Sequence, residues 1–94
     1  MHERTIEAAF TKMVKDRGGL ALKFVSPGNA GVPDRLVILP GGKVAFVELK
    51  APGRRLQPLQ KRRCTQLQHL GCQVHVVSGL EQIPEVIQKI EKGI

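Results

Sequence analysis

The sequence has few aromatic residues and few cysteines, the residue types that stabilise many very small proteins. Its 94 residues include three Phe, no Trp, no Tyr and only two Cys, Cys64 and Cys72. Two cysteines do not form the disulfide framework of a secreted domain, so we interpret both as small apolar residues in a reducing, intracellular (cytoplasmic) environment. Because 41% of the residues are hydrophobic, the chain is not of the disordered class, and its core must consist of Val, Ile, Leu and Ala.

A long apolar run is missing as well. The N-terminal residues His2, Glu3 and Arg4 are polar, and no stretch of about 20 apolar residues follows, so neither a signal peptide nor a spanning helix is expected. The basic stretch that follows Glu48 has no strong amphipathic anchor with Trp or Phe, which argues against a membrane partner. The length predicts a single domain, residues 1–94.

Acidic residues are absent from a long central stretch. No Asp or Glu occurs between Glu48 and Glu81, and the formal net charge of the chain is +7. Six basic residues lie between positions 50 and 63 of this stretch: Lys50, Arg54, Arg55, Lys61, Arg62 and Arg63. A solvated basic face is the ordinary interpretation. The length of the acid-free stretch favours nucleic acid instead, because Lys and Arg that bind phosphates release counterions.

Apolar spacing and turn residues predict seven elements in the order αβββαβα. The expected helices cover residues 3–17, 58–70 and 79–92, and the expected strands cover residues 20–25, 34–39, 44–49 and 72–77. The hairpin signal at 40–43 predicts an antiparallel pair. The later crossover through a helix predicts a parallel pair, so we expect an α/β protein with a mixed central sheet.

Two of the predicted helices carry further signals. For the helix at 58–70 we expect an apolar face of Leu59, Cys64 (or Arg63), Leu67 and Leu70. The last helix has a capping-box pattern in Ser78 and Glu81, although Pro84 allows it to begin near Gln82 instead.

Three charged residues stand where two predicted strands meet. Asp34 opens one strand and Glu48 closes the next across a short hairpin, so antiparallel pairing brings them together. Strand alternation points Glu48 and Lys50 to one face, with the Leu49 carbonyl between them. Two carboxylates and a carbonyl oxygen are hard ligands that suit a divalent cation. Lys50 can then lower the pKa of an attacking water or stabilise charge on a phosphate.

Acids at strand ends are commonly ordinary surface or salt-bridge residues, and three features favour a site here. Glu48 ends the apolar run 44–47, and a buried charge needs a partner or a metal ion. The Gly- and Pro-rich loop before Asp34 gives it no bulky neighbours. The basic stretch begins directly at Lys50, where a DNA backbone would be bound.

These residues resemble the PD-(D/E)XK nuclease superfamily and, more closely, the VRR-NUC family of virus-type replication-repair nucleases. The matching residues are Glu7, Gly31-Val32-Pro33-Asp34, Glu48-Leu49-Lys50 and Leu56-Gln57-Pro58-Leu59-Gln60. The resemblance extends to about Ser78. It implies a nuclease-like core of αβββαβ order, here with an extra C-terminal helix, in agreement with the predicted elements.

The resemblance also implies a role for each matching residue. Asp34 and Glu48 become ligands of Mg²⁺ or Mn²⁺, with the Leu49 backbone carbonyl as a third, and Lys50 becomes the catalytic lysine. Glu7 becomes a helix-borne acid near the metal, acting through water or a second ion. Gln60 becomes the group that orients water or a phosphate. The alternative for Glu7 and Gln60 is that each is an ordinary exposed residue of a helix without a role in the site.

The predicted function is therefore a metal-dependent DNA endonuclease. Family members that stand alone are typically viral and resemble dimeric nucleases acting on branched DNA such as four-way (Holliday) junctions, which implies a homodimer of phage or prophage origin in replication or repair. DNA contacts are expected among Arg35, Arg54, Arg55, Lys61, Arg62 and Arg63, with an Arg35–Glu48 pair as the alternative for Arg35. A non-catalytic nucleic-acid-binding module is the second hypothesis. A restriction-type nuclease subunit, which would need a specificity partner, is the third.

Overall fold

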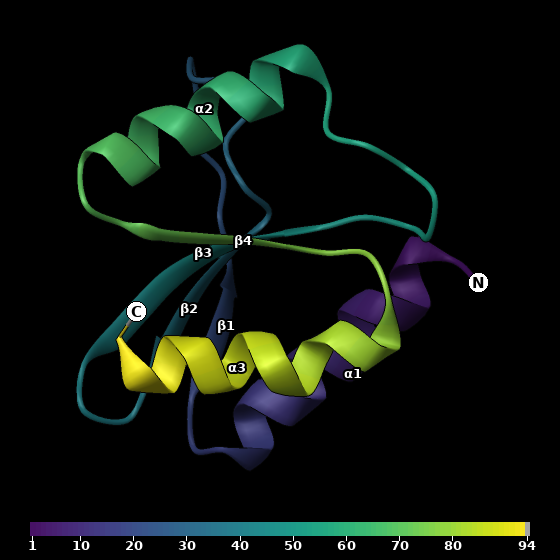
Figure 1. Cartoon of the computed structure of the whole chain (residues 1–94), viewed down its shortest axis with the longest axis vertical. Helices are drawn as coiled ribbons and strands as arrows, with labels where there is room; N and C mark the ends of the chain where they lie inside the picture. Colours follow the sequence, from purple (N-terminus) through teal and green to yellow (C-terminus); the bar gives the residue numbers. More distant parts are fainter. Residues whose placement is uncertain (94) are drawn as a thin grey trace.

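A four-stranded sheet lies between one helix on one side and two helices on the other (Figure 1). The computed structural model describes residues 1–93. The helices are α1 (Glu3–Asp16), α2 (Pro58–His69) and α3 (Ile83–Lys92), with a short 3₁₀ helix, η1 (Leu80–Gln82), before α3; the strands are β1 (Leu20–Lys23), β2 (Arg35–Leu39), β3 (Lys43–Leu49) and β4 (Gln73–Val77). No helix in this part of the chain is both long and apolar enough to cross a membrane.

The sheet has the strand order β1-β2-β3-β4. β1 pairs with β2 and β2 with β3 in antiparallel fashion, whereas β3 and β4 are parallel and are joined through α2. The predicted αβββαβ order with an additional C-terminal helix and a mixed sheet is therefore confirmed. β3 lies inside the sheet, which explains why its sequence is almost continuously apolar before Glu48.

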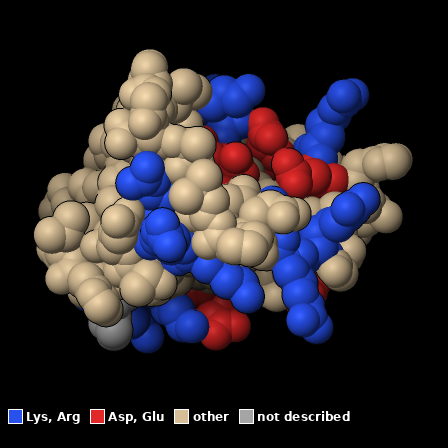
Figure 2. Space-filling model, turned by 90° about the horizontal axis from the view of Figure 1, so that it is seen from above, with Lys and Arg blue, Asp and Glu red and all other residues tan. Residues whose placement is uncertain are grey.

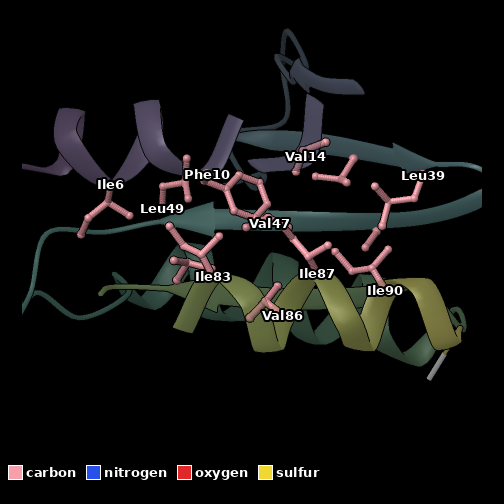
Figure 3. Packing of buried hydrophobic residues seen from close by; sticks show 13 residues of the cluster. Ile6, Phe10, Val14, Leu39, Val47, Leu49, Ile83, Val86, Ile87 and Ile90 are labelled. Atoms are coloured by element: carbon pink, nitrogen blue, oxygen red, sulfur yellow. The ribbon is translucent and has the colours of Figure 1, made fainter. Parts of the chain in front are cut away.

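The apolar core fills the space between the sheet and the helices α1 and α3 (Figure 3). Helical spacing places one stripe of α1 and one of α3 against alternate residues of β2 and β3. The core consists of Ile6, Phe10, Val14, Val37, Leu39, Ala45, Val47, Leu49, Val77, Ile83, Val86, Ile87 and Ile90. Most of these side chains are fully buried, and each contributes roughly 1.5–3 kcal/mol through removal from water.

The opposite face of the sheet carries α2 and is covered only in part. α2 contacts the sheet mainly at β4 and buries a single residue, Cys64. Leu67 is half-buried, but Leu59 and Leu70, which share its predicted apolar face, are 43% and 80% exposed. Leu67 and Leu70 line an open hollow between α2 and Phe24, so the helix and the sheet do not close over this end of the apolar face.

The last helix begins later than its sequence pattern suggested. α3 starts at Ile83 with Pro84 in its first turn, where the missing proline N–H would have no helical partner in any case. The capping box predicted from Ser78 and Glu81 is wrong: the Ser78 amide donates to Oε1 of Gln82 at 2.7 Å. The side chain of Gln82 thus satisfies the backbone at this turn.

The strand expected at residues 20–25 is shorter than predicted. Regular pairing ends at Lys23, opposite Arg35. The Phe24 amide nevertheless donates to the Asp34 carbonyl at 2.8 Å, so the ladder continues by one hydrogen bond before the loop at Pro27 and Gly28 turns the chain away. This bond attaches Asp34 to β1 as well as to β2.

Candidate active site

Asp34 and Glu48 lie side by side at the facing ends of β2 and β3. The register pairs Arg35 with Val47, so the next position outward in the ladder sets Asp34 against Glu48. The Asp34 amide donates to Oε1 of Glu48 at 3.2 Å, and the Leu49 amide donates to Oδ2 of Asp34 at 3.0 Å. These reciprocal hydrogen bonds hold both carboxylates in place, as antiparallel pairing of the two strand ends predicted.

Lys50 and Gln60 converge on the same oxygen of Glu48. Lys50 Nζ lies 3.5 Å from Oε2 of Glu48, so the two side chains share a face of the strand, as the alternation predicted. Gln60 Nε2, in the first turn of α2, donates to that oxygen at 2.9 Å. Its own Oε1 accepts from the Gln57 amide at 2.9 Å, which fixes the Gln60 side chain. The structure thus brings the four side chains of Asp34, Glu48, Lys50 and Gln60 together.

Glu48 is a charged group in an almost fully buried position, with 2% of its surface exposed. Burial and, secondarily, the negative charge of Asp34 raise the pKa of Glu48 from 4.5 to about 7, whereas Lys50 and the Asp34 amide act in the opposite direction. Burial, followed by the charge of Glu48, also raises the pKa of Cys64 behind it, so this thiol stays neutral. A strongly perturbed acid beside a second acid is typical of functional sites.

Glu7 is bound by Arg35. Arg35 Nη2 donates to Oε1 of Glu7, Arg35 Nη1 donates to the Ala21 carbonyl at 3.1 Å, and only 13% of the arginine side chain is exposed. The alternative Arg35–Glu48 pair is therefore wrong, because Arg35 points to the α1 side of the sheet. Within residues 1–93, no three His, Cys, Asp or Glu side chains gather closely enough to hold a metal ion, so Glu7 does not form one cluster with Asp34 and Glu48.

Most of the predicted DNA contacts lie on the surface around the site. Arg54, Arg55, Lys61 and Arg62 are exposed. A hollow of about 380 Å³ opens beside Lys50 and is lined by Arg54 and Arg55, with Glu3 as its acidic residue. Seen from the α2 side, Lys and Arg spread over much of the molecule, whereas Asp and Glu are confined to small areas (Figure 2).

Comparison with known proteins identifies the family and agrees with the fold. Residues 3–81 match the family model of the VRR-NUC domain. The chain belongs to the VRR-NUC family. A solved structure of a VRR-NUC domain is similar with a TM-score of 0.86 at 32% sequence identity, covering 92% of this chain and 94% of that chain. A protein named "Putative nuclease p44", from Acyrthosiphon pisum secondary endosymbiont phage 1, is 52% identical over 79 residues, which are 84% of this chain and 85% of that protein.

The donor atoms of this VRR-NUC site fit a divalent cation. The carboxylates of Asp34 and Glu48 and the carbonyl of Leu49 offer hard oxygen ligands of the type that Mg²⁺ and Mn²⁺ prefer. Burial and then the charge of Asp34 raise the pKa of Glu48, and Lys50 at 3.5 Å offsets this only in part. A divalent cation between the two carboxylates would supply further positive charge.

Two structural roles in this VRR-NUC chain were missed from the sequence. Arg63, expected to contact DNA, donates through Nε to the Ala30 carbonyl at 2.9 Å and so attaches α2 to the loop that precedes Asp34. Its half-buried position was indicated only by its place near the apolar stripe of the helix. The Glu7–Arg35 pair left no local signal, because its partners are 28 residues apart.

Proposed function

We propose that this VRR-NUC chain is a metal-dependent DNA endonuclease that hydrolyses phosphodiester bonds in branched DNA, such as four-way junctions, during phage-type replication or repair. The family and the name of the phage relative support a nuclease, and the source of that relative supports a phage or prophage origin. The observation that carries the proposal is the pairing of half-buried Asp34 with buried Glu48, with Lys50 beside one oxygen of Glu48.

The residues of the site divide the chemistry among them. Asp34, Glu48 and the Leu49 carbonyl would hold Mg²⁺ or Mn²⁺, with Glu7 acting through water. The bound cation would polarise the phosphate and lower the pKa of the attacking water. Lys50 Nζ is placed to donate to a phosphate oxygen and to stabilise the negative charge that grows during attack. Gln60, fixed by Gln57, holds Glu48 and can orient a water or phosphate oxygen next to it.

The exposed arginines extend the site along a DNA backbone. The hollow that Arg54 and Arg55 share with Lys50 would take the phosphate next to the scissile one. Lys61 and Arg62, on the exposed part of α2, would contact phosphates further along the strand. Such contacts supply affinity without sequence preference, as expected for an enzyme that recognises DNA shape.

The test is cleavage of plasmid DNA and a synthetic four-way junction with Mg²⁺ or Mn²⁺. We expect wild-type protein to cut the junction, Asp34→Ala and Lys50→Ala to lose activity, and Lys89→Ala, which removes the same charge from an exposed position on α3, to retain it. Equal activity of all four proteins would overturn the active-site assignment. DNA binding without cleavage in either metal would favour the non-catalytic binding module instead.

We further propose a homodimer that forms through the part of the α2 face of the sheet that the helix leaves open. On this face Leu20, Leu22 and Val44 are 58%, 44% and 45% exposed, and clustered exposed apolar residues mark interaction surfaces. A two-fold dimer would place two active sites on the two halves of a symmetric junction. Sedimentation should show a dimer for the wild type and a monomer for Leu22→Lys, whereas Leu80→Lys, away from this sheet face in η1, should leave the dimer intact.

A further inference from the structure

A second hollow opens between α2 and the loop that joins β1 to β2. Its volume is about 530 Å³, and its apolar walls include Phe24, Val32 and Leu67. Pockets of about 300–1,000 Å³ with apolar walls and a few polar groups are typical of sites for small planar ligands. Phe24 offers the flat surface here, and its ring is supported from behind by Phe46 at a centroid distance of 5.4 Å.

Residues that line this hollow lie close to Asp34 along the chain and through a backbone hydrogen bond. Val32 precedes Asp34 by two residues, and the Phe24 amide donates to the Asp34 carbonyl at 2.8 Å. On the helix side, Leu67 lies seven positions after Gln60, which corresponds to about 10 Å along α2. Successive nucleotides of one strand are about 3.4 Å apart in a stacked helix, so the hollow lies within a few nucleotides of a phosphate bound at Glu48 and Lys50.

The rim of the hollow is polar and basic. Asn29 and Gln66 place exposed side-chain amides there, and Arg63 donates to Oε1 of Gln66 at 3.1 Å. No acidic residue is among those that line it in the described chain. Amides can bond the edges of a base, an aromatic ring can stack on its face, and a cation attracts its phosphate. A second copy of this chain, with a net charge of +7, fits such a basic rim poorly.

We propose that this hollow binds one unpaired base of the DNA strand close to the scissile phosphate, with Phe24 as the stacking surface. The inference rests on the proposed function, in that DNA is the substrate. A branch point interrupts the continuous stack of base pairs, so a base beside it is extruded more easily than a base inside a continuous duplex, where unstacking and unpairing cost a few kcal/mol. The hollow therefore provides a physical basis for a preference for branched over plain duplex DNA.

Binding of labelled single strands, with Ca²⁺ in place of Mg²⁺, tests the base requirement directly. Two 15-nucleotide probes are compared by fluorescence anisotropy, an oligothymidylate and the same backbone with abasic sites throughout its centre. Wild-type protein should bind the strand with bases roughly 5- to 150-fold more tightly, which corresponds to one stacked base. Phe24→Leu should bring this ratio close to one without changing the affinity for the abasic strand. Leu80→Ala, an apolar truncation at an exposed position outside the hollow, should retain the ratio.

A second pair of variants keeps the proposal testable if Phe24→Leu does not fold. Gln66→Glu adds a carboxylate at the rim, and Gln68→Glu adds the same charge two positions further along α2, outside the hollow. Only Gln66→Glu should weaken binding of the strand with bases, by tenfold or more. Equal affinity of wild-type protein for both probes would overturn the proposal, as would equal effects of the two glutamate variants. A wild-type dimer that Gln66→Glu converts to a monomer would assign the hollow to a protein contact and would also overturn it.

Cleavage of the junction in Mg²⁺ separates this inference from the nuclease proposal. A protein that binds the two probes differently but cuts no DNA would contradict the nuclease activity and support base binding in the hollow. A protein that cuts junctions but binds both probes equally would contradict base binding in the hollow alone.

Discussion

The two faces of the sheet differ in how completely they are covered, and β3 shows the difference within three residues. Val47 and Leu49 point toward α1 and α3 and are almost fully buried among apolar side chains. Glu48, between them, points toward α2, where Lys50, Gln60 and Asp34 meet its carboxylate. Two helices seal the first face, whereas one helix leaves parts of the second open. The fold thus separates the contacts that stabilise the protein from the groups that carry its chemistry.

The largest effect is expected on the face that carries α2, where a substitution should lower activity without lowering stability. Asp34→Asn should lower the cleavage rate about 10³-fold, roughly 4 kcal/mol in the activation barrier. The asparagine can still accept the Leu49 amide, and the charge next to Glu48 disappears, so stability should stay equal or rise. Initial rates on a four-way junction and thermal unfolding measure the two quantities. A large loss of stability in this variant would show that the two faces are not independent.

On the face covered by α1 and α3, a substitution should lower stability without lowering activity. Ile87→Ala should lower the free energy of unfolding by about 2–5 kcal/mol, because Ile87 is fully buried between α3 and the sheet. Cleavage per folded molecule should not change. Leu22→Ala, on the partly open face where 44% of Leu22 is exposed, serves as the matched control. It should lower the free energy of unfolding of the monomer by less than about 1 kcal/mol. Urea unfolding at equal protein concentration compares the two variants.

The pH dependence of stability should reveal the buried acid. Because the pKa of Glu48 is raised from 4.5 to about 7 in the folded protein, the native state binds the proton more tightly than the unfolded chain. This stabilisation is complete below pH 4.5 and is lost as the pH rises through about 7, by up to ~3 kcal/mol. Urea unfolding in EDTA at several pH values measures the loss. Glu48→Gln should remove this part of the pH dependence, and an unchanged slope would contradict the raised pKa.

The smallest effect concerns Glu7 and Arg35, which pair on the α1 side of the sheet. If Glu7 acts near the metal, Glu7→Gln should raise the Mg²⁺ concentration needed for half-maximal cleavage, whereas Arg35→Gln should do so only by releasing Glu7. Each variant should cost about 1 kcal/mol of stability, and the double variant should cost less than their sum because the two residues form one pair. Additive losses of stability with unchanged Mg²⁺ dependence would contradict both roles.

Much of the fold was predictable because its signals are local. The apolar spacing of Ile6, Phe10 and Val14 defines the inner face of α1, and the turn residues at 40–43 define the β2–β3 hairpin. The errors occurred where position depends on distant packing. Leu70 has the spacing of a buried residue, yet it lines the open hollow beside Phe24 and is 80% exposed. The capping box predicted from Ser78 does not form. The Gln82 side chain accepts from the Ser78 amide instead, because η1 tightens the chain before α3.

The sequence by itself determined the order of elements, the strand pairing and the placement of Asp34, Glu48 and Lys50 at one strand end, since alternation and hairpin pairing follow from local periodicity. Only the tertiary structure decided which groups meet them. It brought Gln60 from α2 onto Glu48, bound Glu7 to Arg35 and formed the hollow of Phe24 beside Asp34. These contacts join residues ten or more positions apart and depend on how each helix lies on its face of the sheet, which no short stretch of sequence records.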